Sequence, residues 1–67
     1  MEIGDFKGRI TPFRVRIHPA CDWWMRGATH GRVTTVGREV LTVRLEVGGA
    51  DIGKSVKIHP ENILEIV

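Results

Sequence analysis

The chain has 67 residues, a net charge of +2 and one cysteine. A chain of this length holds one domain and one modest core, because it buries only about 60% of the surface that its unfolded form exposes. The single cysteine excludes an internal disulfide, and the charged first residues lack the apolar run of a secretory signal, so we expect a reducing, cytoplasmic setting. The apolar stretches are too short to cross a bilayer, and no membrane partner is expected.

Alternating hydrophobic and polar residues predict the first β-strand near the beginning of the chain. The alternation runs over residues 13–17, and Pro19 ends it. The twelve residues before this strand lie outside the pattern and are expected to form an N-terminal arm or an added edge strand. Residues 19–29 are predicted to form a long loop.

A β-hairpin is predicted in the middle of the chain. Residues 30–36 are rich in β-branched side chains, and residues 40–47 show the most regular alternation. The loop between them, residues 37–39, contains glycine and has a length that suits a hairpin. The apolar residues expected on the inner face of residues 40–47 are Leu41, Val43, Leu45 and Val47.

The last third of the chain predicts two more strands and one helical turn. The glycine-rich residues 48–53 are expected to form neither helix nor strand. Residues 54–59 alternate again, with Val56 and Ile58 inward. Residues 60–62 then suit a single helical turn before a last short strand over residues 63–67. The sequence therefore predicts an all-β domain with five strands.

The order and spacing of these elements resemble SH3-like barrels. Those barrels have five short strands, a long first loop, a hairpin, and a helical turn before the last strand. The resemblance implies an all-β, five-stranded SH3-like barrel over residues 13–67, with residues 1–12 as the arm.

A second resemblance lies in the tail of the chain. The tail contains the segment Ser55-Val56-Lys57-Ile58-His59-Pro60, followed by Leu64-Glu65. This pattern resembles the S-V-Q-I-Y-P segment and following L-E of the plasmid-borne, trimethoprim-insensitive dihydrofolate reductases. In addition, Val15-Arg16 is similar to a V-R in the first strand of that family. That family forms tetramers of SH3-like barrels around a pore lined by the Gln, Ile and Tyr of the motif and by a first-strand Lys. The corresponding positions here hold Lys57, Ile58, His59 and Ile17. Only the isoleucine matches, so the resemblance supports the fold and does not imply reductase activity.

Two further resemblances are to KOW-type barrels and to small proteins encoded in phage and bacterial genomes. Gly27, Gly31, Val33 and Val36 follow a G-x(3)-G-x-V-x-x-V spacing that is similar to KOW-type barrels of ribosomal and transcription proteins. There glycine allows a tight turn, and the valines belong to the core. Residues 18–27 also resemble small uncharacterised proteins encoded in phage and bacterial genomes.

Outward-facing basic side chains predict a surface that contacts phosphates. Its members on the predicted strands are Arg14, Arg16, Arg44 and Lys57. Trp23 and Trp24 are adjacent in a loop and cannot both enter one core, so one is expected to be exposed. An exposed Trp24 beside Arg26 would stack on a base. The favoured hypothesis is a non-catalytic nucleic-acid-binding module; the alternative for the basic residues is a solvated polar face with interspersed glutamates.

The rival hypothesis is a structural or protein-interaction module that self-associates. In so short a chain, without a disulfide or a metal, an interface is the remaining common source of stability. The candidate interface residues are Trp23, Trp24 and Met25 in the loop and Ile3, Phe6 and Ile10 in the arm. A homodimer is expected first and a tetramer next. Folding of these groups back onto their own barrel is the open alternative.

No catalytic residue, metal or cofactor is predicted. His18, His30, His59 and Cys21 lack the C-x-x-C and H-x(3)-H spacings of zinc sites. A Cys–His nucleophile pair would lack the third group that orients the base. An enzyme similar to the plasmid-borne reductases is therefore only a distant third hypothesis.

Overall fold

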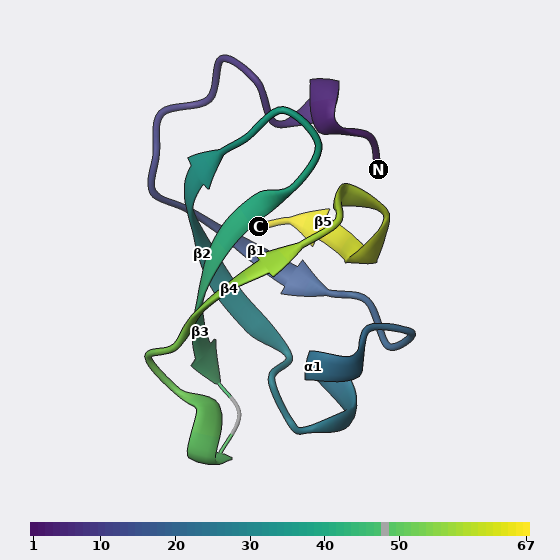
Figure 1. Ribbon diagram of the computed structural model, residues 1–67, viewed down its shortest axis with the longest axis vertical. Coiled ribbons are helices and arrows are strands. Elements are labelled where there is room, and N and C mark those ends of the chain that lie inside the picture. The colour runs from purple at the N-terminus through teal and green to yellow at the C-terminus, as the bar shows by residue number, and fades with distance from the viewer. Residues whose placement is uncertain (48) are drawn as a thin grey trace.

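The computed structural model describes residues 1–47 and 49–67 and contains one antiparallel sheet of five strands. The order across the sheet is β4-β3-β2-β1-β5 (Figure 1). The five strands are β1 (Phe13–Ile17), β2 (His30–Val36), β3 (Leu41–Val47), β4 (Ser55–Ile58) and β5 (Ile63–Ile66). The prediction of a mostly β domain with five strands is confirmed.

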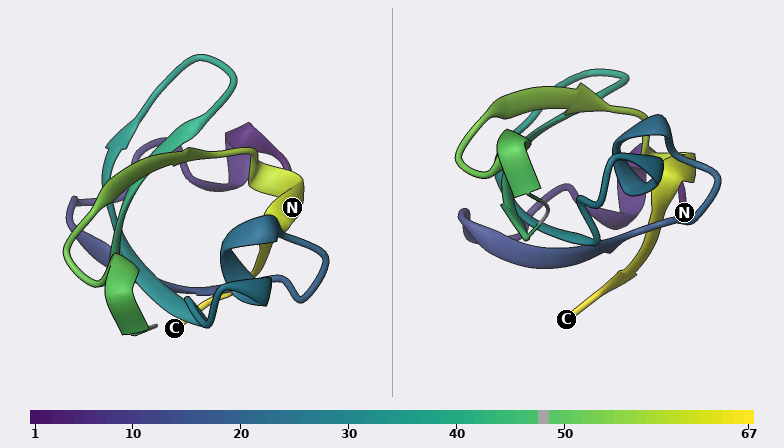
Figure 2. Two further views of the ribbon diagram at one scale, coloured as in Figure 1. Left: turned by 60° about the horizontal axis from the view of Figure 1, so that its bottom comes forward. Right: turned by 90° about the horizontal axis from the view of Figure 1, so that it is seen from below.

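The sheet is strongly curved (Figure 2). Strands β4 and β5 form its two edges, and each pairs with one neighbour among the described residues. Successive side chains of a strand point to opposite faces, and the apolar set of each strand faces inward. The buried hydrophobic residues are Phe6, Val15, Ile17, Cys21, Ala28, Val33, Leu41, Val43, Leu45, Ile58 and Ile63.

One position of β3 departs from the predicted alternation. The register between β2 and β3 pairs Gly31 with Leu45 but His30 with Val47, so Glu46 is an extra residue on β3. Such a bulge shifts the alternation beyond it. Val47, which the sequence predicts on the inner face, is therefore 41% exposed.

Short helical segments connect the strands. The 3-10 turn η3 (Pro60–Asn62) is the single helical turn predicted before the last strand. Helix α1 (Asp22–Met25) and the 3-10 turn η2 (Gly49–Asp51) form where a loop and an irregular connection were expected. Gly48 of that connection lies outside the described residues. In the part of the chain that the structure describes, no helix has the length and hydrophobicity to span a membrane.

The N-terminal segment packs onto the sheet. It begins with the 3-10 turn η1 (Ile3–Asp5), after which Phe6 is fully buried in the core. The rings of Phe6 and Phe13 stack with their centroids 6.2 Å apart, and the Arg9 guanidinium lies 5.9 Å from the centroid of Phe13. Phe6, expected at an interface between copies, is thus a core residue of its own chain, because a large aromatic ring stabilises the small core most when it is fully buried.

Candidate nucleic-acid interface

Three arginines form a row across the outer face of the sheet. Arg14 on β1 lies directly opposite Arg32 on β2, and Arg32 lies directly opposite Arg44 on β3. All three are exposed, because their neighbours along each strand point into the core. Facing side chains on adjacent strands have Cβ atoms about 4.5–5.5 Å apart. We call Arg14, Arg32 and Arg44 the arginine row.

Glu46 neutralises part of the arginine row. Its Oε1 lies 3.3 Å from Nε of Arg14, and its Oε2 accepts a hydrogen bond of 3.0 Å from Nε of Arg32. The Oε1 atom is shielded from solvent and accepts no hydrogen bond from the described residues. Arg44 forms no ion pair within residues 1–47 and 49–67. Two guanidinium groups of the row therefore share one carboxylate, and the third has no ion-pair partner among the described residues.

Two more of the predicted basic residues lie on the same outer face, and both already have partners. Arg16 follows Arg14 on β1 and forms an ion pair of 2.7 Å with Glu65 of β5. Lys57 of β4 lies opposite Thr42 and donates a hydrogen bond of 2.8 Å from Nζ to its Oγ1. The predicted residues Arg14, Arg16, Arg44 and Lys57 thus share one face. Among the described residues, Arg44 and Lys57 have no ion-pair partner, and Lys57 bonds to a neutral hydroxyl.

The two tryptophans point in different directions, as the sequence predicts. Trp23 packs against the core, whereas Trp24 is 39% exposed. The Arg26 guanidinium lies 5.2 Å from the centroid of the Trp23 ring, so Arg26 contacts the partly buried tryptophan. Helix α1 follows β1 and precedes β2, which places Trp24 beyond the ends of these strands (Figure 1).

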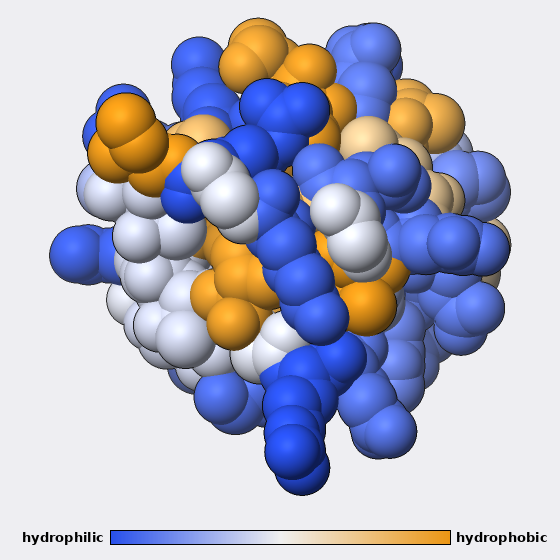
Figure 3. Space-filling model, turned by 90° about the horizontal axis from the view of Figure 1, so that it is seen from above, coloured by the Kyte–Doolittle hydropathy of each residue, from blue (hydrophilic) through white to orange (hydrophobic). Residues whose placement is uncertain are grey.

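The predicted interface residues are spread over the molecule. Met25 is 73% exposed beside Trp24, and Ile10 is 91% exposed in the N-terminal segment, while Ile3 is partly buried against the core. The end of the molecule that carries the N-terminal segment is seen in Figure 3. There, hydrophilic side chains separate the hydrophobic surface into small patches. On helix α1, by contrast, two exposed apolar residues, Trp24 and Met25, are adjacent in the chain.

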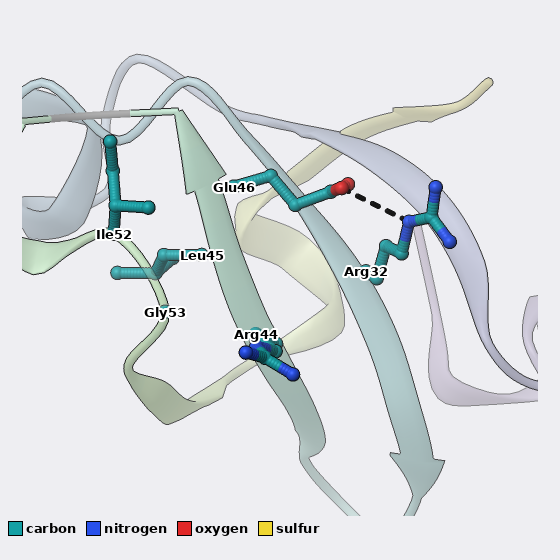
Figure 4. A pocket seen from close by; sticks show the side chains of 6 residues that line it. All are labelled: Arg32, Arg44, Leu45, Glu46, Ile52 and Gly53. Atoms are coloured by element: carbon teal, nitrogen blue, oxygen red, sulfur yellow. Dashed lines mark hydrogen bonds and ion pairs between the residues drawn. The ribbon is translucent and has the colours of Figure 1, made fainter.

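A shallow pocket of about 360 Å³ adjoins the arginine row. It is lined by Arg32, Arg44, Leu45, Glu46, Ile52 and Gly53 (Figure 4). Figure 4 shows Ile52 on one side of β3 and the ion pair of Glu46 with Arg32 on the other. Ile52 is 58% exposed, although it is apolar. The pocket thus joins cationic and apolar groups on one surface.

No protein-family model, curated protein or solved structure matches this chain. The positions that resemble the plasmid-borne reductases lie at the end of β4 and directly after it. Ile58, the position shared with their pore-lining set, is buried in the core at the end of β4. Lys57 and His59 on either side of it are exposed.

The histidines and the cysteine do not converge. Among residues 1–47 and 49–67, no three His, Cys, Asp or Glu side chains come together as a metal site requires. Nδ1 of His18 accepts a hydrogen bond from the backbone N–H of Ala20, and Nδ1 of His30 lies 3.0 Å from Oγ1 of Thr29. Cys21 is buried in the core.

Sequence reasoning missed three residues of this surface. Arg32 is the centre of the arginine row, and the alternation of β2 around the buried Val33 was a signal for its outward position. Glu46 lies at a β-bulge and contacts two arginines from there. Ile52 lies beside β3 in the pocket, although the connection that carries it shows no periodic pattern of apolar residues. No sequence pattern indicated either of these two placements.

Proposed function

We propose that this protein binds nucleic acid through the outer face of its sheet, without reading sequence and without a catalytic step. The observation that carries the proposal is the arginine row. Like charges directly opposite one another destabilise a sheet, so three facing arginines are costly for folding alone. A phosphate backbone supplies the negative charge that the row lacks.

The chemistry of the side chains supports phosphate as the ligand group. A guanidinium presents a planar fork of donors that matches two phosphate oxygens. Arg44 is exposed and has no carboxylate partner among the described residues, so its donors are open to a ligand. Contacts of this kind position a nucleic acid and carry no direct sequence information.

The test measures binding of a labelled oligonucleotide by fluorescence anisotropy as the salt concentration rises. We expect binding at about 50 mM salt that weakens steeply with added salt. Replacing Arg32 and Arg44 together with glutamine should weaken binding and reduce the salt slope by about two units. The control replaces Lys7 and Arg38 with glutamine; these line a different pocket, by the N-terminal segment and the hairpin loop. Equal losses from the two double variants would contradict the proposal.

For the fold, we propose that the curved sheet is an SH3-like barrel. The strand order β4-β3-β2-β1-β5 and the turn η3 between the two edge strands support this proposal. NMR measurements would check it through close contacts between the side chains of β4 and β5 across the core. An experimental structure in which these two strands stand apart would contradict it.

A second proposal is self-association through α1. Trp24 and Met25 are adjacent, apolar and exposed on this helix. An interface would add burial that a domain of this size otherwise lacks. A symmetric dimer is the default form.

A further inference from the structure

The pocket beside the arginine row differs from the rest of the outer face because it includes an apolar side chain. Ile52 lies in the connection before β4, and this connection is held against β3 by hydrogen bonds. The N–H of Gly53 donates to the carbonyl of Leu45 at 2.7 Å, and the N–H of Leu45 donates to the carbonyl of Lys54 at 2.9 Å. The position of Ile52 in the wall of the pocket that Arg44 also lines is therefore a consequence of the fold.

A pocket of this composition suits a nucleobase. A base has flat apolar faces, and a guanidinium plane such as that of Arg44 stacks on such a face. The side chain of Ile52 offers an apolar contact in the wall of the same pocket. The pocket volume of about 360 Å³ falls within the range of ligand pockets, roughly 300–1,000 Å³.

A base within a duplex is paired and stacked, so it cannot enter a pocket beside the backbone that it belongs to. An unpaired base has free faces and can turn toward a protein surface. With phosphates on Arg14 and Arg32, a neighbouring base would reach Arg44 and Ile52 only if the strand is single.

We propose that the pocket of Arg44 and Ile52 receives an unpaired base, so that the protein prefers single-stranded to double-stranded nucleic acid. This inference rests on the proposed function. It assigns the phosphates to Arg14, Arg32 and the N–H donors at the edge of the Arg44 guanidinium, and the base to the flat face of that guanidinium and to Ile52.

The experiment compares three probes at one salt concentration: a single-stranded thymidine oligonucleotide, a duplex of the same length, and an abasic strand with the same number of phosphates. We expect the wild-type protein to bind the thymidine strand roughly fivefold more tightly than the abasic strand. Ile52→Ser should lower affinity for the thymidine strand toward that for the abasic strand and leave binding of the other two probes unchanged. Ile10→Ser, at an exposed isoleucine of the N-terminal segment, should change none of the three.

The outcomes separate this inference from the proposed function. Equal affinity of the wild-type protein for the abasic and thymidine strands overturns the base pocket and leaves phosphate binding in place. An equal loss of all three affinities in Ile52→Ser also overturns it. If none of the three probes binds at low salt, the proposed function and this inference both fail.

Discussion

Arg32 lies directly opposite Arg44 in the β2–β3 hairpin, so two positive charges face each other across adjacent strands. Removing one of them should stabilise the domain. We expect Arg44→Thr to raise the free energy of unfolding by up to roughly 0.5 kcal/mol at low salt, with a smaller gain at high salt. Urea denaturation measures this change. Lys57→Thr is the matched control, because Lys57 also lies on a strand but faces Thr42. A stability loss in Arg44→Thr as large as that in the control would contradict the prediction.

Glu46 occupies the position between two arginines that a phosphate would take. Glu46→Gln should therefore raise the affinity for nucleic acid, because Arg14 and Arg32 lose the carboxylate that competes for them. Glu39→Gln removes the same charge from the exposed hairpin loop and controls for the general gain in net charge. Fluorescence anisotropy titrations with a labelled oligonucleotide compare the affinities of the two variants. Equal gains would mean that Glu46 does not compete with the ligand.

Adjacent residues of β3 should respond in opposite ways to polar substitution. Val43 is fully buried, and Val43→Asp would bury a charge at a cost of roughly 4 kcal/mol or more, enough to unfold a domain of this size. Arg44→Ser changes an exposed position and should leave the domain folded. Circular dichroism melting curves compare the two. A cooperative transition near the wild-type temperature in Val43→Asp would refute the strand register.

Gly31 lies where two strands approach closely. A Cβ atom added there would lie 2.5 Å from Cγ1 of Val43 and 2.9 Å from the carbonyl oxygen of Arg44. We expect Gly31→Ala to destabilise the domain by roughly 1–3 kcal/mol, because the backbone oxygen cannot move away easily. Gly4→Ala is the control, since nothing lies within 4 Å of its added Cβ. A similar urea midpoint for both variants would contradict this placement of β2.

Self-association is tested by sedimentation velocity at micromolar concentration. If α1 forms the interface, Met25→Gln should shift the protein toward the monomer, whereas Ile10→Gln should not, although Ile10 is more exposed. The difference is expected because Met25 lies beside a second exposed apolar residue, Trp24. A wild-type protein that stays monomeric throughout this concentration range would exclude the interface.

The strands were predictable from the sequence because burial on one face imposes a period of two. The same period predicted that Arg14 and Arg44 point outward. It failed at Val47, because the bulge at Glu46 adds a residue to β3 that leaves no mark in the pattern.

The short helices and the pocket were harder to foresee. A helix of four residues such as α1 is too short to show a helical period. The contacts of Glu46 with Arg14 and Arg32 depend on which strands are neighbours, and the place of Ile52 depends on the hydrogen bonds of Gly53. These relationships are tertiary, so no local pattern records them.

The burial of Phe6 bears on how the protein can be shortened. A fragment that starts at residue 13 would keep all five strands but would leave a hole the size of a phenyl ring beside Phe13. Emptying such a site typically costs about 3–5 kcal/mol, a large share of the stability of a small domain. The first twelve residues thus complete the hydrophobic core of the sheet through Phe6, and any shortened version of this domain needs to retain them.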